Sequence, residues 1–424
     1  MRHSVKEVTL SNGAKGLFVH VPGASVMTFE FNFRAGDFLC ETGKWETAHL
    51  MEHMVLGANE RIPKAREFQA EFEKNGAYCN ASTGSYDIIY ESECADFEWE
   101  RIADNLIIAI SKPLFLEGEF KSEYSNVREE LTGRKNNHFR YLSLSLQQAY
   151  GFAVKTDQER LKLMSNVTTQ DVRKHYTNTH TLSNLRFVIS GKITDVRESK
   201  LIQMIESMEL PKGNGRIDLP DETPSKISEP LYIANRTIDN FYFYTDMFVQ
   251  HKLSRDQADA LGLVNNILTE TLHSRILGEA REQGLVYSMS SNYSIAKKCS
   301  GWWFGAQVTS QNAPALFNII SKELTAARNG DISQSDISAA KQYSLGRFQR
   351  GGQTVGGVAS GYAWRYFFDG TVNDYSAIPD RIRSVTRENI EEVVASFVDS
   401  KIKGIGFLGA VNKDTRTQLA DMLI

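Results

Sequence analysis

Within residues 26–34, apolar and polar side chains alternate strictly from residue 27 onward. Phe29, Phe31 and Phe33 fall on one face of a strand, and polar side chains occupy the positions between them. This period of two predicts an antiparallel strand with one buried face. Apolar residues recur with helical spacing in 101–111 and in 120–132, which predicts two helices. Antiparallel strands mixed with helices indicate an α+β fold.

Two stretches of the chain repeat one pattern 218 positions apart. The stretches 167–191 and 385–409 each open a helix at Val-Thr and each end 24 positions later in a strand that stops at glycine. Thr168 and Thr386 fit as helix N-caps. The repeat predicts a tandem duplication with one α+β fold in each half. Chance similarity between two amphipathic elements is the alternative.

Glycine and proline cluster between the two repeats, with five of them in the 14 positions 211–224. Such clustering is typical of a loop. We therefore predict a linker at 213–228 between an N-terminal domain, residues 1–212, and a homologous C-terminal domain, residues 229–424. Each domain is expected to be a largely antiparallel sheet packed with helices.

Composition and charge exclude several classes of protein. The 48 basic and 52 acidic residues give a net charge of −4, without the basic excess of a nucleic-acid-binding protein. No stretch approaches the roughly 18 apolar residues that span a bilayer, and the N-terminus lacks the apolar core of a secretory signal. The four cysteines have no CxxC spacing, which argues against thiolate zinc sites and disulfide frameworks. We expect a soluble, cytoplasmic protein.

The segment WETAHLMEHMVLG, residues 45–57, holds the most informative polar pattern. On a helix His49 and His53 lie one turn apart on one face, with about 6 Å between their Cβ atoms. Two imidazoles so placed can share one Zn²⁺, and Glu52 can reach a water there without ligating the metal. The alternative is a polar helix face whose charges are solvated. HxxEH should arise by chance only about 0.01–0.02 times in a chain of this composition.

A catalytic zinc normally has three protein ligands, so a third must come from elsewhere. The best candidates lie in 123–131. Glu123 and Glu130 are seven positions apart and share a helical face, whereas Glu129 lies about 100° away. A carboxylate pair on one face suits a metal ligand with a supporting acid. Without the upstream motif, an exposed charged helix would be the favoured interpretation.

HxxEH is the inverzincin motif, and Glu130 follows His53 by 77 positions. In both respects the chain resembles the pitrilysin-type zinc peptidases, the family of insulin-degrading enzyme and mitochondrial processing peptidase, as a half-size member. The resemblance implies His49, His53 and Glu130 as ligands, Glu52 as general base and Glu123 as a supporting acid. The second half has no HxxEH, so one zinc ion per chain is expected.

The segment GAYCNAST, residues 76–83, resembles the family's edge strand, which pairs with the substrate backbone. This resemblance implies substrate-binding roles for Asn80, Ala81 and Thr83. Asn80 as a turn residue is the alternative.

The segment REQGLVY, residues 281–287, resembles a second-half element that binds substrate near the metal. It implies roles for Arg281 and Tyr287, and Tyr287 could also donate a hydrogen bond to the developing oxyanion. The spacing of this element is one residue shorter than usual. A second departure from the family is Glu46, which stands where glycine is frequent.

The resemblance implies a zinc-dependent endopeptidase that hydrolyses peptides or unfolded polypeptide segments, using metal-activated water and a glutamate general base. A catalytically silent binding or assembly subunit of the same fold is the alternative, and a metal-dependent hydrolase of another amide is a third possibility. Two domains are half of the full-length family architecture. A homodimer, or a heterodimer with a metal-free paralogue, is therefore expected.

Overall fold

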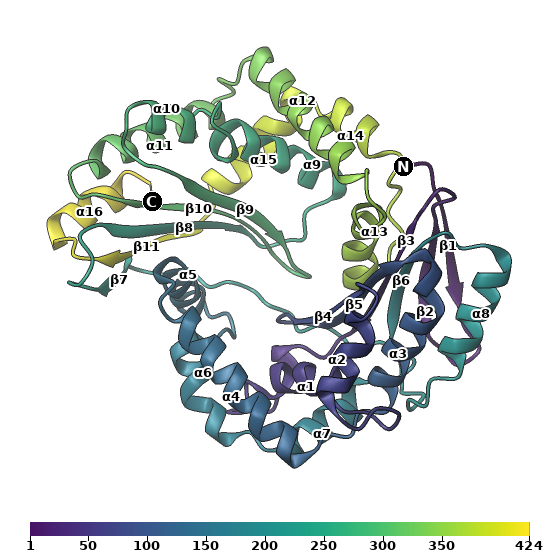
Figure 1. The fold of residues 1–424 in the computed structure, drawn as a ribbon. Coiled ribbons are helices and arrows are strands. Elements are labelled where there is room, and N and C mark those ends of the chain that lie inside the picture. Colours follow the sequence, from purple (N-terminus) through teal and green to yellow (C-terminus); the bar gives the residue numbers. More distant parts are fainter. Residues whose placement is uncertain (424) are drawn as a thin grey trace. The chain divides into compact units, whose positions relative to one another are not determined.

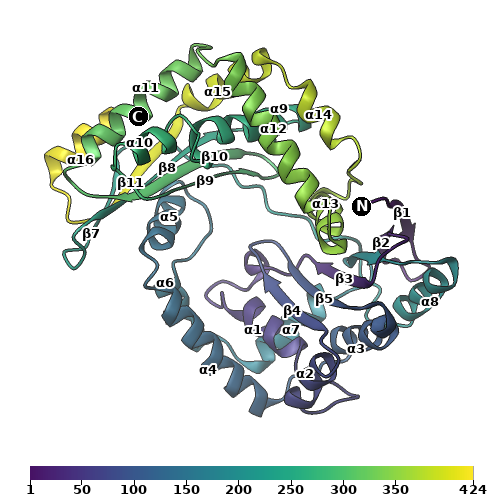
Figure 2. The ribbon, with the colours of Figure 1, turned by 45° about the horizontal axis from the view of Figure 1, so that its top comes forward.

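The computed structural model describes residues 1–423, in which the strands form two mixed sheets packed with helices (Figures 1 and 2). This confirms the predicted α+β class. Sheet 1 contains β1 (Ser4–Thr9), β2 (Lys15–His20), β3 (Val26–Phe33), β4 (Tyr78–Thr83), β5 (Ile88–Ala95) and β6 (Arg186–Gly191). Sheet 2 contains β7 (Leu231–Ala234), β8 (Phe241–Val249), β9 (Met289–Ile295), β10 (Ser300–Val308) and β11 (Ile402–Gly409).

Sheet 2 repeats the topology of sheet 1 without its first strand. The order in sheet 1 is β1-β2-β6-β3-β5-β4, and the order in sheet 2 is β7-β11-β8-β10-β9. Each sheet has one parallel pair, β2 with β6 and β7 with β11, and its other neighbours are antiparallel. Thr168 and Thr386 are both the predicted N-caps, and each forms a capping box. The shared topology supports the predicted duplication.

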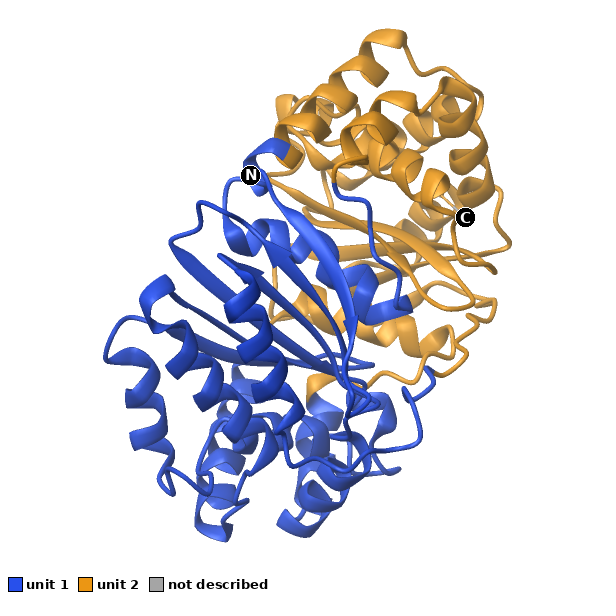
Figure 3. Cartoon of the chain, turned by 90° about the vertical axis from the view of Figure 1, so that its right-hand side faces the viewer, with its two compact units in different colours: residues 1–133, 158–219, 349–375 blue, residues 134–157, 220–348, 376–424 orange. Residues whose placement is uncertain are grey.

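The described residues divide into two compact units (Figure 3). Unit 1 consists of 1–133, 158–219 and 349–375, and unit 2 contains the rest of the described chain. Each unit therefore includes a segment from the other half of the sequence. The homologous domains 1–212 and 229–424 are defined by the sequence repeat rather than by these units, and they stay a prediction.

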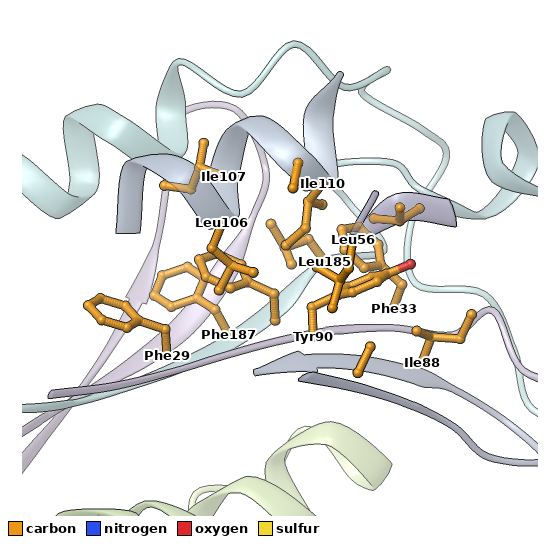
Figure 4. Close-up of a cluster of buried hydrophobic side chains, with 14 of the residues drawn as sticks. Phe29, Phe33, Leu56, Ile88, Tyr90, Leu106, Ile107, Ile110, Leu185 and Phe187 are labelled. Atoms are coloured by element: carbon orange, nitrogen blue, oxygen red, sulfur yellow. The ribbon is translucent and has the colours of Figure 1, made fainter. Parts of the chain in front are cut away.

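Helices cover both faces of sheet 1. On one face α3 packs over the sheet, where its Leu106 and Ile110 lie above Phe29, Tyr90 and Phe187 (Figure 4). The predicted helices at 101–111 and 120–132 are confirmed as parts of α3 and α4. The helices with most or all of their residues in unit 1 are η1 (Asp37–Leu39), α1 (Thr47–Val55), α2 (Ala65–Glu73), η2 (Asp96–Glu98), α3 (Trp99–Ser111), α4 (Glu117–Arg134), α6 (Asp157–Leu163), η3 (Met164–Asn166), α7 (Thr169–Thr179), α8 (Asp195–Glu206) and α13 (Val355–Asp369).

Strand β3 is buried on both faces, so the prediction of one solvent-exposed face was wrong. Helix α13 packs against β3 and β6 on the side opposite to α3. Thr28 and Asn32 are therefore buried although they alternate with phenylalanines. The Asn32 amide donates a hydrogen bond of 2.7 Å to Asp87, and the amide oxygen of Asn32 accepts one from Arg216. The Asn32 amide is thus satisfied by protein partners rather than by water, whereas the buried Thr28 hydroxyl has no hydrogen-bond partner among the described residues.

Sheet 2 also carries helices on both faces. On one face Leu142, Leu146 and Tyr150, from α5 and its C-terminal end, pack against Tyr244 and Phe248 of β8. The other face packs against the remaining core of unit 2. The helices of unit 2 are α5 (His138–Ala149), α9 (Arg255–Asn265), the π-helical η4 (Asn266–Glu270), α10 (Leu277–Glu282), α11 (Ala313–Arg328), α12 (Gln334–Gly351, whose last three residues lie in unit 1), α14 (Ile378–Ser384), α15 (Arg387–Val398) and α16 (Lys413–Asp421).

The predicted linker begins as an ordered segment of unit 1. Arg216 donates hydrogen bonds to the backbone carbonyls of Asn184 and Phe367, and the Ile217 carbonyl accepts one of 2.6 Å from Arg34. The stretch 207–230 contains no helix or strand. Of the helices in residues 1–423, none combines the length and the apolar character needed to cross a membrane.

Candidate metal centre

Helix α1 carries both histidines of the HxxEH motif and lies beside β4 and α7 (Figures 1 and 2). Three of its own side chains, Leu50, Met51 and Met54, are fully buried. Because the helix is only nine residues long, this packing rather than intrinsic propensity fixes its position. The imidazole rings of His49 and His53 have their centroids 5.0 Å apart. The predicted helical spacing of the two rings is therefore realised.

The structure brings together the three residues predicted as metal ligands. Glu130 reaches the histidines from α4, with its Oε2 atom 3.3 Å from Nε2 of His49 and 3.9 Å from Nε2 of His53. One ligand atom from each residue lies within 4.8 Å of the other two. Two imidazole nitrogens and one carboxylate oxygen, converging in this way, match the donor set of a catalytic zinc site with an open fourth position. The residues present therefore fit a zinc ion.

The outer nitrogen of His53 is held by Glu123. The Nδ1–H of His53 donates a hydrogen bond of 2.9 Å to Oε2 of Glu123, which also accepts one of 3.2 Å from Asn126. The hydrogen bond with His53 is the main reason why the pKa of Glu123 is lowered, against the effect of partial burial. With Nδ1 protonated, Nε2 of His53 presents a lone pair toward Glu130.

The outer nitrogen of His49 is held by Glu46, a residue that stood out in the sequence only as a departure from the family. Nδ1 of His49 lies 3.0 Å from Oε2 of Glu46, and Arg160 donates to both carboxylate oxygens of Glu46. Burial raises the pKa of Glu46, but the hydrogen bond with His49 and the charge of Arg160 lower it overall. Burial lowers the pKa of His49, but bonds with Glu130 and Glu46 raise it to about 9. A signal for Glu46 existed, since its i,i+3 spacing places it beside His49.

Glu52 does not belong to the ligand group and instead faces strand β4. Thr83 donates a hydrogen bond of 2.5 Å to Oε2 of Glu52. Within residues 1–423, strand β4 pairs with β5 alone and lies at the edge of sheet 1, so the segment 76–83 contains the edge strand that the resemblance implies. Asn80 lies within that strand rather than in a turn; its side chain is exposed and donates to Tyr78, whereas Ala81 is buried.

Arg281 and Tyr287 belong to unit 2, whereas the other predicted site residues belong to unit 1. The Arg281 guanidinium lies 4.7 Å from the centre of the Tyr287 ring and donates to the Tyr287 carbonyl. The Tyr287 residue is 82% exposed, so its hydroxyl is open to other molecules. Their role near the metal stays a prediction.

Two family models match the chain. Insulinase (Peptidase family M16) matches residues 43–164, which include the HxxEH helix and Glu130, and Peptidase M16 inactive domain matches residues 166–343. The chain belongs to the peptidase M16 (insulinase) family. The predicted resemblance to pitrilysin-type peptidases is thereby confirmed. Curated proteins give no match to this M16 sequence.

Solved structures share the fold over nearly the whole chain. A protease from Helicobacter pylori is 19% identical with a TM-score of 0.83, and the match covers 96% of this chain and 100% of that chain. A peptidase M16 inactive domain from Pseudomonas fluorescens is 16% identical with a TM-score of 0.81, covering 96% and 98%. At these identities the likeness shows the fold of the M16 chain and no more.

Proposed function

We propose that this M16 family member is a zinc-dependent endopeptidase that cleaves peptides or unfolded polypeptide segments. The observation that carries the proposal is the convergence of His49, His53 and Glu130 within 4.8 Å, beside a further carboxylate, Glu52, on the same helix as the histidines. Structural zinc sites have four protein ligands, whereas three leave a position open for a water. The added acid next to an edge strand is what hydrolysis of a peptide requires.

Bound zinc would supply polarisation of the scissile carbonyl and a water of lowered pKa. The chain's own groups would do the rest. Glu52 would take the proton of the attacking water on the carboxylate oxygen that Thr83 does not occupy, and it would return that proton to the leaving amine. Glu130 would contribute a negative charge to the site, while Glu123 and Glu46 keep the imidazoles oriented.

The edge strand β4 supports a peptide as substrate. No strand of the described chain pairs with its outer side, so the N–H and C=O groups there can pair with an extended segment. Such pairing reads the substrate backbone, which a folded protein does not present. This favours unfolded segments over native proteins and over small amides that lack a backbone to pair.

The test is a digest of a peptide library, read by mass spectrometry, together with analysis of metal content. Purified protein should contain about one zinc ion per chain, and it should cleave the library until a chelator is added. Glu52→Gln should keep the zinc and lose cleavage. Zinc without cleavage in the wild type would favour the alternative, a silent binding or assembly subunit. Absence of zinc from metal-replete protein would overturn the metal site itself.

The proposed oligomer is a homodimer or a heterodimer with a metal-free paralogue. It rests on the family resemblance, in which two half-size chains close around one substrate. Arg281 and Tyr287 of one chain would then complete the site of the other, and the exposure of Tyr287 is compatible with that role.

A further inference from the structure

The His49 ring is held by a carboxylate that water does not reach. Glu46 is completely buried, and its Oε2 atom lies 3.0 Å from Nδ1 of His49. Both oxygens of the same carboxylate accept hydrogen bonds from Arg160, one of them at 3.1 Å. Arg160 lies on α6, 114 positions away in the sequence, and its side chain is only 9% exposed. The carboxylate is thus fixed from two sides.

Arg160 is itself held by a second acid. Its Nη1 atom lies 3.5 Å from a carboxylate oxygen of Asp37, in the short helix η1. A single guanidinium therefore joins η1, α6 and the start of α1 beneath the histidine. The four side chains form a continuous chain of contacts, Asp37–Arg160–Glu46–His49, with the metal-facing nitrogen of His49 at its end.

This network is not explained by the stability of helix α1. Glu46 occupies the N-cap position, but its side chain makes no capping hydrogen bond. A buried ion pair also gains little stability, because removing two charges from water costs about as much as their attraction returns. The network instead orients the His49 ring, because a fixed acceptor at Nδ1 selects one tautomer and one ring orientation.

We propose that Glu46, locked by Arg160, is a positioning residue that holds His49 as the Nδ1–H tautomer with Nε2 aimed at Glu130. The inference rests on the proposed metal site and adds to it a residue that pre-organises one ligand. It also makes the two histidines unequal. The partner of His49 is buried and adjoins the same helix, whereas the partner of His53 is half-buried and lies on α4.

The first measurement is zinc affinity, determined by competition with a chromophoric chelator. Glu46→Ala removes the acceptor and should weaken zinc binding by about 10–100-fold. Glu46→Gln retains an oxygen acceptor for Nδ1–H and should recover part of that loss. Arg160→Lys keeps the charge but loses the two-pronged contact, so it should fall between the wild type and Glu46→Ala.

The second measurement reads the tautomer directly in metal-free protein. At a pH above about 9, where His49 is neutral, side-chain ¹⁵N spectra should show it as the Nδ1–H form in the wild type, assigned by the loss of the signal in His49→Ala. In Glu46→Ala the signal should shift toward the Nε2–H form. This readout needs neither zinc nor activity, so it separates a failure of Glu46 from a failure of the metal proposal.

Asp96→Asn is the matched control, because Asp96 pairs with both terminal nitrogens of Arg197 in the same unit without touching a histidine. It should lower the melting temperature and leave zinc affinity and the His49 tautomer unchanged. The proposal is overturned if Glu46→Ala behaves like this control. If Glu46→Ala does not fold, zinc affinity and the His49 tautomer are measured in Glu46→Gln and Arg160→Lys instead. Wild-type values of both properties in both variants would overturn the proposal.

Discussion

The hydroxyl of Thr83 lies 2.5 Å from a carboxylate oxygen of Glu52 and donates a hydrogen bond to it. The two residues are 31 positions apart, one on edge strand β4 and the other on helix α1. The strand proposed to bind substrate therefore also orients the proposed base. The Thr83–Glu52 hydrogen bond thus links the strand that would pair with a peptide to the group that would accept the proton.

Replacing Thr83 by valine keeps the shape of the side chain and removes the hydroxyl. A hydrogen bond to a charged group contributes roughly 1.5–3 kcal/mol, so kcat should fall by about 10-fold or more. KM should change little, because backbone pairing with β4 remains. Steady-state kinetics on one fluorogenic peptide measure both values.

Ser82→Ala is the control for the Thr83 variant, since Ser82 is exposed and points to the other face of β4. It should leave kcat unchanged. An equal loss of kcat in the two variants would mean that the strand, and not the Thr83–Glu52 bond, is what the substitution disturbs.

Removing the charge of Glu130 should remove the metal. Glu130→Gln leaves two imidazoles and a neutral amide, and zinc affinity should fall by at least about 100-fold with loss of cleavage. Glu129→Gln changes the adjacent, exposed acid and should keep both properties. Metal content after dialysis separates the two variants, and the reverse pattern would assign the ligand to Glu129.

A site shared between chains should allow two inactive variants to restore activity together. Glu52→Gln lacks the base, and Tyr287→Phe lacks the hydroxyl proposed to act in the partner's site. In a mixed dimer one site has an intact Glu52 and an intact Tyr287 from the opposite chain. Mixing the two proteins should therefore return part of the wild-type activity. No recovery in dimers shown to have exchanged subunits would place Tyr287 outside the shared site.

The pH dependence of stability should include a contribution from Glu30. Burial, with a smaller effect from the charge of its cross-strand neighbour Glu91, raises the pKa of Glu30 to about 7. The folded state therefore holds this proton more tightly than the unfolded state, whose pKa is near 4.5. The contribution is complete below pH 4.5 and is lost as the pH rises through 7.

Glu30→Gln should abolish that loss. Relative to the wild type, the variant should gain about 1–3 kcal/mol of unfolding free energy between about pH 5 and pH 8. Denaturant titrations at both values measure it. Glu129→Gln, at an exposed position, should shift stability by similar amounts at the two pH values. An unchanged slope in Glu30→Gln would show that Glu30 ionises normally.

Two glycines at equivalent positions should tolerate no side chain. Gly191 and Gly409 end β6 and β11 with φ angles of 142° and 148°. A Cβ atom on them would lie 2.6 Å from Met27 and Phe241, respectively. Alanine at either position should lower the unfolding free energy by about 1–3 kcal/mol.

Helical glycines with open surroundings provide the controls for these substitutions. A Cβ atom added to Gly133 in α4 or to Gly346 in α12 would meet no other group within 4 Å. Alanine there should be neutral or should stabilise by up to about 1 kcal/mol. Thermal or denaturant unfolding compares the four variants. Equal effects at all four positions would contradict the steric argument.

The local part of the site could be predicted from the sequence because helical geometry fixes it. The spacing of His49 and His53 places both rings on one face, and the spacing of Glu123 and Glu130 does the same on α4. The prediction for each pair required only that its own segment be helical. Periodicity does not predict that the two helices meet at one point. The family resemblance predicted it.

The remaining contacts depend on residues that are distant in the sequence. The Arg160 side chain reaches Glu46 across 114 positions, and no local pattern connects them. The prediction for strand β3 failed for the same reason, because α13, the helix that covers its polar face, follows more than 300 positions later. A period of two reports that neighbouring side chains differ in polarity. It does not report whether the polar side meets water or protein.

The placement of α5 and α13 has a consequence for cutting the chain. Helix α13 covers β3 and β6 although it comes from the second half, and α5 covers β8 and β11 although it comes from the first. A break within 213–228 would separate each helix from its sheet, so that the N-terminal fragment would expose the buried polar face of β3 and the C-terminal fragment the apolar face of β8 that carries Tyr244 and Phe248. Neither fragment should fold stably when produced alone, and co-expression of the two should restore the fold, because each fragment carries the helix that covers the sheet of the other.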